Sequence, residues 1–137
     1  MKKIYTILLI SVLLIVGISG YVFASNSDEG IMPLWDHVSS VLGNLSFSAN
    51  TGTVYITVYG NEDVTKIDAT ARLYYQNERG RWVKTSTAWN YSVNSDELAI
   101  NETFAAESGK TYRVLLSASV YVGDTKEAVL EEFIGKY

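Results

Sequence analysis

Residues able to do chemistry are sparse in this sequence. His37 is its only histidine, and Asp36 beside it cannot easily orient the imidazole, because successive side chains of an extended chain point apart. Nucleophilic catalysis needs a base held next to the nucleophile, and zinc is bound by several imidazole or thiolate ligands. The sequence contains no cysteine. We therefore expect no catalytic residue, no metal ligand and no cofactor, and we interpret His37 as an edge residue that packs or faces solvent.

Three pairs of adjacent carboxylates offer a second kind of chemistry, that of a glycosidase. They are Glu62-Asp63, Asp96-Glu97 and Glu131-Glu132. A glycosidase needs two carboxylates that face each other across a cleft. The first two pairs lie in predicted turns and the third on a predicted terminal strand, so we interpret all three as solvated surface charge. The two turns also contain asparagine, but neither has the ligand spacing of a known calcium loop.

Aromatic residues are the more promising group, since the chain has ten tyrosines and three tryptophans. Tyr, Trp and Arg are enriched among the residues that contribute most binding energy at protein interfaces. We predict a binding surface on the sheet that contains the two longest strands, formed by Arg72, Tyr74, Trp82, Arg113, Leu115 and Tyr121. The alternative is that tyrosine is a good strand former whose hydroxyl is simply solvated.

Two long alternating segments must position these side chains. Every second residue from Tyr112 to Val120 faces one side and is apolar or aromatic, and the segment from Ile67 to Tyr75 repeats the pattern. Period-two alternation is typical of a strand with one buried face. The two segments are long enough to pair, and the residues between their apolar positions then point away from the core.

Shorter segments with the same period complete the pattern. Further strands are predicted at about 45–49, 54–58, 98–104 and 128–134, with Asn, Gly and Asp between them. Residues 82–89 are rich in strand formers, and a bulge is expected there, because an unbroken strand would put Trp82 and Trp89 on opposite faces. About seven short strands predict an all-β fold, an antiparallel immunoglobulin-like (fibronectin type III-like) β-sandwich.

The N-terminus has the layout of a secretory signal peptide. A short basic start precedes an apolar stretch from Ile4 to Ile18, and small residues lead to a predicted cleavage after Ala24. We therefore expect a hydrophobic signal helix at 1–24, a flexible leader and edge segment at 25–42, and the β-sandwich domain at 43–137. The alternative is an uncleaved segment that anchors the domain in a membrane.

Residues 31–38 stand out in the leader, because they are apolar and contain the only proline and the only histidine. Proline is not tolerated in a central strand, so this segment is predicted to be a short edge strand or a turn packing over one end of the core. Helical spacing keeps a short helix as the second interpretation, and the residues concerned are Trp35, Val38, Val41 and Leu42.

Charge and cysteine content limit the partners. The mature chain 25–137 has nine basic and fifteen acidic side chains, a net charge of −6. This surplus repels phosphate backbones, so we do not expect nucleic acid as a partner. Without cysteine, a secreted domain of this size is held together by its core alone.

Several motifs occur together along the chain. They are Ser108-Gly109-Lys110-Thr111-Tyr112-Arg113-Val114, Val120-Tyr121-Val122-Gly123, Val64-Thr65-Lys66-Ile67 and the spaced Trp82 and Trp89. With these motifs the chain resembles a group of small secreted proteins of Gram-positive, clostridia-like bacteria. The resemblance covers nearly the whole mature chain and implies a signal peptide, one immunoglobulin-like β-sandwich and no assigned activity. Tyr112 stands where a tyrosine-corner residue begins a late strand in such folds.

These patterns predict a non-enzymatic module, secreted or at the cell surface, that binds an unknown protein. A carbohydrate-binding module remains open, in which Trp82, Trp89 or exposed tyrosines stack on sugar rings. An enzyme would be indicated by hydrolase activity that is lost on His37→Ala. A membrane enters only through an uncleaved N-terminal segment, and edge-to-edge assembly through the last strand, 128–134, also stays open.

Overall fold

A computed structural model describes residues 34–137, and every regular element in this range is a β-strand. The strands are β1 (Val38–Ser48), β2 (Thr51–Gly60), β3 (Lys66–Gln76), β4 (Trp82–Val93), β5 (Glu97–Ala105), β6 (Thr111–Val122) and β7 (Thr125–Lys136). The described residues, 34–137, contain no helix that could span a membrane. The predicted signal helix at 1–24 and the first part of the leader lie outside the described residues.

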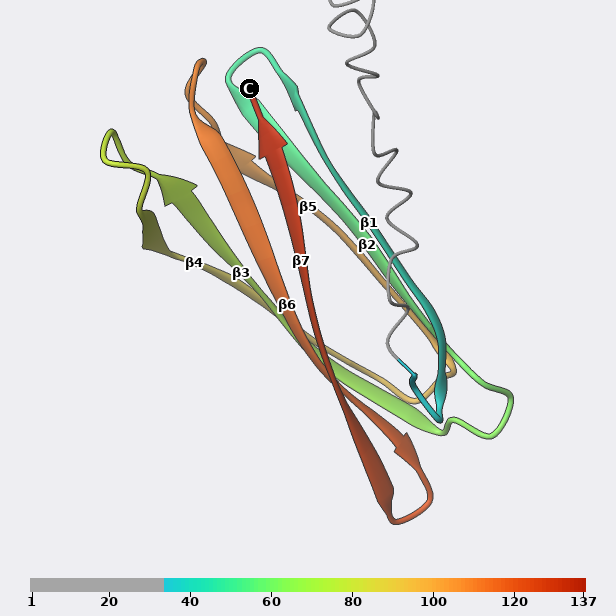
Figure 1. Cartoon of the computed structure of the whole chain (residues 1–137). Helices are drawn as coiled ribbons and strands as arrows, with labels where there is room; N and C mark the ends of the chain where they lie inside the picture. The colour runs from blue at the N-terminus through green and yellow to red at the C-terminus, as the bar shows by residue number, and fades with distance from the viewer. Residues whose placement is uncertain (1–33) are drawn as a thin grey trace, which may run out of the picture. The chain divides into compact units, whose positions relative to one another are not determined.

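The seven strands form two antiparallel sheets (Figure 1). One sheet has the strand order β1-β2-β5 and the other has the order β4-β3-β6-β7. The chain passes from one sheet to the other after β2, after β4 and after β5. Crossings of this kind stack two sheets into a sandwich. The predicted all-β, immunoglobulin-like sandwich of seven antiparallel strands is therefore confirmed.

The core lies between the sheets and follows the alternation that the sequence predicts. β3 and β6 are neighbours, with Ala71 opposite Leu116. Their buried side chains are Ile67, Ala69, Ala71 and Leu73 from β3 and Tyr112, Val114, Leu116, Ala118 and Val120 from β6. Burial of one large aliphatic side chain contributes about 1.5–3 kcal/mol. The inward faces of these two strands are therefore a main source of stability, and their other faces are left for solvent or a partner.

β1 begins earlier than the sequence predicts. The sandwich was expected from residue 43, but β1 starts at Val38, which is buried and pairs with Gly60. The Glu127 carboxylate on β7 accepts hydrogen bonds from the backbone N–H groups of Asp36 and His37, each at 2.9 Å. This contact joins residues about ninety positions apart, so local periodicity could not predict the early start.

The segment before β1 supports the turn interpretation over the helical one. Residues 34–37 contain a bend and no helix, and Trp35 packs against the core. β1 itself is an edge strand of the three-stranded sheet. The helical spacing of the apolar residues in this segment therefore does not reflect a helix. The segment is a bend followed by a bulged strand, and the pairing of that strand with β2 shifts between Val38 and Ser40.

The predicted bulge in β4 is present, but it does not bring the two tryptophans to one face. The register against β3 shifts between the pairs Arg72–Ala88 and Tyr74–Lys84, so that three β4 residues stand opposite Leu73 alone. Two extra residues preserve the in-out alternation. Trp82 therefore lies on the outer side of the sheet, and Trp89 packs against the core.

Aromatic rings fill one end of the core. Phe47, Phe104, Tyr112 and Tyr137 contact one another, with centroid separations from 5.1 to 6.2 Å. The Tyr112 hydroxyl accepts a hydrogen bond of 2.8 Å from the backbone N–H of Glu107, five residues upstream. This is the arrangement of a tyrosine corner, as the sequence predicts for Tyr112.

Candidate binding face

One side of the four-stranded sheet points away from the core, and we call it the outer sheet face. On β3 and β6, its residues are those that alternate with the buried positions. On β4 and β7, its residues are the ones that pair with these outward-facing residues of β3 and β6. All six residues predicted for the binding surface lie on it: Arg72, Tyr74, Trp82, Arg113, Leu115 and Tyr121. The structure thus places these side chains on one surface, and whether that surface binds a partner stays a prediction.

Arg113 is the centre of one group on this face. Its guanidinium carbon lies 4.6 Å from the centroid of the Tyr74 ring and 4.7 Å from that of the Trp82 ring. Its Nη1 lies 3.4 Å from the Glu132 carboxylate on β7. We call Tyr74, Trp82, Arg113 and Glu132 the arginine cluster. A cation–π contact contributes about 0.5–1 kcal/mol at an exposed site and more where the pair is desolvated, so the two rings and the carboxylate together hold the arginine in place.

Register explains how three strands and the start of a fourth build this cluster. Tyr74 on β3 stands directly opposite Arg113 on β6, and Ile134 on β7 is the partner of Arg113 on the other side. Trp82, the first residue of β4, is paired with Gln76. The Arg113 side chain is 19% exposed, against 53% for Glu132. The Arg113 side chain is therefore mostly covered, while its carboxylate partner stays largely in solvent.

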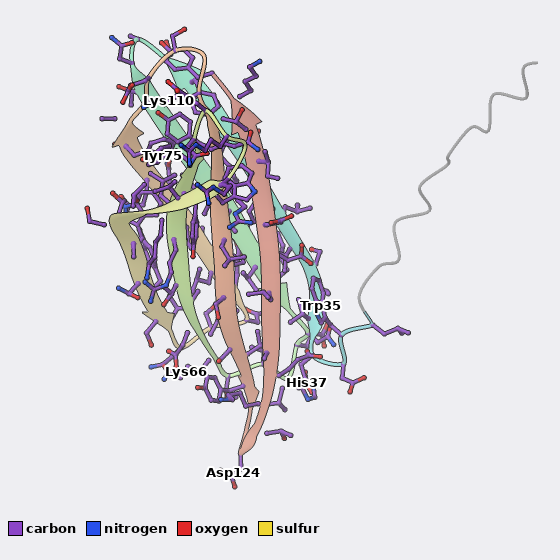
Figure 2. All side chains as sticks on the ribbon, turned by 60° about the vertical axis from the view of Figure 1, so that its left-hand side comes forward. Trp35, His37, Lys66, Tyr75, Lys110 and Asp124 are labelled. Carbon is purple, nitrogen blue, oxygen red and sulfur yellow. The ribbon has the colours of Figure 1, made fainter. Side chains whose placement is uncertain are left out.

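The other predicted residues are spread along the same face. Arg72 is exposed and pairs with Leu115, one step along the strands from the arginine cluster. Tyr121 lies at the far end, where the Lys66 ammonium sits 5.2 Å from its ring centroid. Figure 2 shows Lys66 at the opposite end of the sandwich from Tyr75 and Lys110. Arg72 and Leu115 thus extend the arginine cluster, and Tyr121 does not belong to it.

Sequence reasoning missed three outer-face residues on β7. Glu132 was interpreted as solvated charge, but it pairs with Arg113. Leu130 and Ile134 were assigned to no surface, yet they are 67% and 55% exposed. The sequence of β7 contains no signal that would identify them, because Val129-Leu130, Glu131-Glu132 and Phe133-Ile134 put residues of the same kind on both faces of the strand.

A polar stretch occupies the middle of the face and forms a shallow depression of about 280 Å³. Thr70 donates a hydrogen bond of 2.8 Å to the Asn90 side chain, and Ser92 donates one of 2.5 Å to Asp68. The Lys66 ammonium donates to the other Asp68 oxygen at 2.8 Å. These donors, Lys66 first and Ser92 second, lower the pKa of Asp68 below its ordinary value.

A second hollow, of about 360 Å³, lies near the end of the sandwich where Figure 2 labels Tyr75 and Lys110. The Lys110 ammonium is 5.2 Å from the Tyr75 ring centroid and forms a 2.8 Å ion pair with Glu107. The hydrogen bond to Glu107 is the main reason that the pKa of Lys110 is raised. Each charged group on this rim is already paired, so the hollow presents no free charge to a ligand.

The candidates for catalysis are not brought together. His37 is half-buried, and its backbone is bound to Glu127 and to Asn61, whose N–H donates to the His37 carbonyl at 2.9 Å. Among residues 34–137, no group of three His, Cys, Asp or Glu side chains is placed to hold a metal ion. Glu62, Asp63 and Asp96 are exposed in the turns where the sequence predicts them, and Glu97 is exposed as the first residue of β5.

No family model matches this chain. A search of curated proteins finds no match either. Among solved structures, a β-glucuronidase from Parabacteroides merdae with glycerol in its active site matches with a TM-score of 0.44 and 15% identity over 70% of this chain. The sporulation control protein Spo0M from Bacillus subtilis matches with 0.39 and 10% over 75%, and CsgH from R. palustris with 0.34 and 12% over 66%.

These similarities are too weak to say what this chain does. The chain spans 13% of the glucuronidase, 51% of the Spo0M chain and 90% of the CsgH chain. What the chain binds has to be argued from its own residues.

Proposed function

We propose that this chain is a non-enzymatic β-sandwich module, secreted or at the cell surface, that binds another protein through its outer sheet face. The observation that carries the proposal is the arginine cluster. Arg113 is held between the Tyr74 and Trp82 rings on a surface that no other described strand covers. Arginine, tyrosine and tryptophan are the residue types enriched among the binding hot spots of protein interfaces.

Preorganisation is the physical advantage of this arrangement. Ordering a long side chain on binding costs about 0.5–1.5 kcal/mol. The rings and the Glu132 carboxylate already fix the Arg113 guanidinium in the free protein, so a partner does not have to order it. Apolar side chains border the cluster, namely Leu115, Leu130 and Ile134. A fixed polar centre with an apolar surround resembles the composition of a recognition site.

The localisation in this proposal rests on the N-terminal sequence pattern, and attachment to a membrane through an uncleaved segment is its alternative form. A carbohydrate-binding role remains the second candidate because Trp82 is at the surface. Arg113, however, already lies against both the Trp82 and the Tyr74 ring. Arg113 thus takes up one face of each ring that a sugar could stack on, and arginine beside aromatic rings is typical of protein interfaces, so we favour a protein partner.

Affinity capture from the culture medium of the expressing cells tests the proposal. The full chain is compared with Trp82→Ala and Arg113→Ala by quantitative mass spectrometry of the retained proteins. We expect one partner whose retention falls about thirtyfold in both variants, since a hot-spot residue contributes about 2 kcal/mol or more. Tyr55→Ala is the matched control, because Tyr55 is 51% exposed on the other sheet.

Two results would contradict the proposal. Equal retention by Trp82→Ala, Arg113→Ala and the control would place the binding site elsewhere. Binding on a glycan array that is lost in Trp82→Ala, without any Trp82-dependent protein partner, would favour the carbohydrate-binding alternative. Thermal melting of each variant verifies that a loss reflects binding and not unfolding.

A further inference from the structure

Basic side chains are concentrated on the outer sheet face. Residues 34–137 contain nine lysines and arginines and thirteen acidic residues, so this part of the chain is acidic as a whole. Six of the nine basic residues alternate onto the outer sheet face: Lys66, Arg72, Lys84, Arg113, Lys126 and Lys136. Only two acidic residues, Asp68 and Glu132, share it. The face is therefore positive on a negative domain.

The three-stranded sheet shows that this distribution is not a general property of the strands. β1, β2 and β5 contain no lysine or arginine. Their charged residues are Glu97 and Glu102, both on β5. The outer side of this sheet thus lacks the positive charge that its counterpart carries, although both sheets are built from strands of similar length.

The two acidic residues on the outer sheet face do not neutralise it. Asp68 is paired with Lys66, and Glu132 is paired with Arg113. Arg72 and Lys84 are exposed and make no ion pair within the described range 34–137. These two residues flank Tyr74. Lys84 on β4 is the pairing partner of Tyr74, and Arg72 lies two positions before Tyr74 on β3. A partner at the arginine cluster therefore meets two unpaired positive charges.

Apolar side chains decide between the kinds of acidic partner. Leu130 and Ile134 are more than half exposed on the same face, and Leu115 lies between their strand and Arg72. A sulfated or phosphorylated polysaccharide has little apolar surface to bury against exposed leucine and isoleucine. Protein interfaces, in contrast, combine aromatic, apolar and arginine side chains. The surface therefore matches a protein that is acidic and carries apolar side chains.

We propose that the partner presents a segment rich in Asp and Glu with interspersed apolar residues, whose carboxylates pair with Arg72 and Lys84. This inference rests on the proposed function and adds the chemistry of the partner. Complementary charge raises the association rate and excludes partners of the wrong sign. Binding is therefore weakened by salt, because exposed charges are screened within about 8 Å at physiological ionic strength.

Selection of a random peptide library on the full chain tests the inference. We expect the enriched peptides to contain more Asp and Glu than the library and to retain apolar residues. Affinity of a selected peptide is then measured by fluorescence anisotropy. The double substitution Arg72→Gln with Lys84→Gln is expected to weaken it about tenfold, from two exposed ion pairs of about 0.7 kcal/mol each.

The control changes the net charge by the same amount on the other sheet. Asn44→Glu with Ser46→Glu adds two negative charges on exposed positions of β1, and we expect less than a twofold effect. Raising the salt concentration is expected to reduce the difference between the native chain and the Gln variant.

The outcomes separate this inference from the proposed function. If Trp82→Ala abolishes peptide binding while the Gln variant binds normally, the inference is wrong and the outer sheet face remains the site. If neither affects it, both are wrong. Binding of a heparin fragment with no selection of acidic peptides would indicate a polysaccharide, and oligomers of the full chain that dissociate in the Gln variant would indicate a second copy as the partner. Either result overturns the inference.

Discussion

At the scale of single residues, the outer sheet face is defined by the contacts of Arg113. Its guanidinium packs against two rings and donates one hydrogen bond to Glu132, and its buried Nε has no hydrogen-bond partner among residues 34–137. An arginine is suited to this position because its planar group stacks on aromatic rings while remaining charged. A lysine at 113 would keep the charge but lose the stacking, so the fixed geometry depends on the residue type.

A second residue-scale interaction closes the sandwich where β4 and β5 meet. The Tyr91 hydroxyl donates a hydrogen bond to the Glu102 carboxylate, and both side chains are half-buried. Tyr91→Phe removes the donor and leaves the carboxylate without it, which we expect to lower the free energy of unfolding by about 1 kcal/mol. Urea unfolding of the two chains at neutral pH measures this difference.

The same interaction predicts a pH dependence. The hydrogen bond to Glu102, followed by burial, raises the pKa of Tyr91 above its ordinary value. Because the folded pKa is the higher one, the stabilisation is fully present below the unfolded value of about 10 and is lost as the pH rises through the folded value. The difference from Tyr91→Phe should thus be constant near neutrality and shrink in strong alkali. A difference that grows with pH would contradict the assignment.

At the scale of elements, the bulge in β4 is stabilised by Thr85. Its hydroxyl donates to the Leu73 carbonyl at 2.9 Å and accepts from the Thr87 N–H at 3.1 Å. Thr85→Val keeps the shape of the side chain but removes both bonds, and we expect a loss of about 1–2 kcal/mol in the free energy of unfolding. Thr87→Val is the matched control, since the Thr87 hydroxyl makes no hydrogen bond within residues 34–137. Equal effects of the two substitutions would show that the bulge does not depend on this hydroxyl.

Edge strands bear on the possibility of assembly through β7. Glu127 and Glu131 on β7 and Glu102 on β5 alternate toward the core side of their sheets. Inward-pointing charges on edge strands are one of the ways in which natural sheets avoid pairing with other chains. Glu127 is occupied by the backbone before β1, which covers that edge near its start. Edge-to-edge assembly is therefore disfavoured at both edges that carry these residues.

At the scale of the whole molecule, the fold can be predicted from sequence periodicity, because apolar residues at every second position of a strand mark its buried face. Periodicity identifies the inward faces of β3 and β6, and with them the outward positions of Arg72, Tyr74 and Arg113. It cannot predict which strands become neighbours, and so the pairing of Glu132 with Arg113 was missed. Periodicity also cannot predict the size of the β4 bulge. A bulge with one extra residue and a bulge with two extra residues are compatible with the same sequence, but they put Trp82 on opposite faces of the sheet.

The charge distribution arises only at this scale. The basic residues of the outer sheet face come from four strands, and in the sequence they are interspersed with acidic ones. Net charge alone indicates an acidic protein for which we expect no nucleic-acid partner, and it does not reveal a basic surface. Folding separates the charges, because the sheet order β4-β3-β6-β7 gathers the basic positions of these strands on one side.

Masking one sheet face at a time is the most direct test of the central claim, that this chain binds through its outer sheet face. The sequence has no cysteine, so a single one can be modified selectively. Ser117→Cys on the outer sheet face and Ser46→Cys on the other sheet, both at exposed positions, are coupled to polyethylene glycol maleimide in the full chain. The measurement is retention of the partner and of the selected peptides. We predict that coupling at 117 abolishes retention and that coupling at 46 leaves it unchanged, and the reverse pattern, or no effect at 117, would contradict the account.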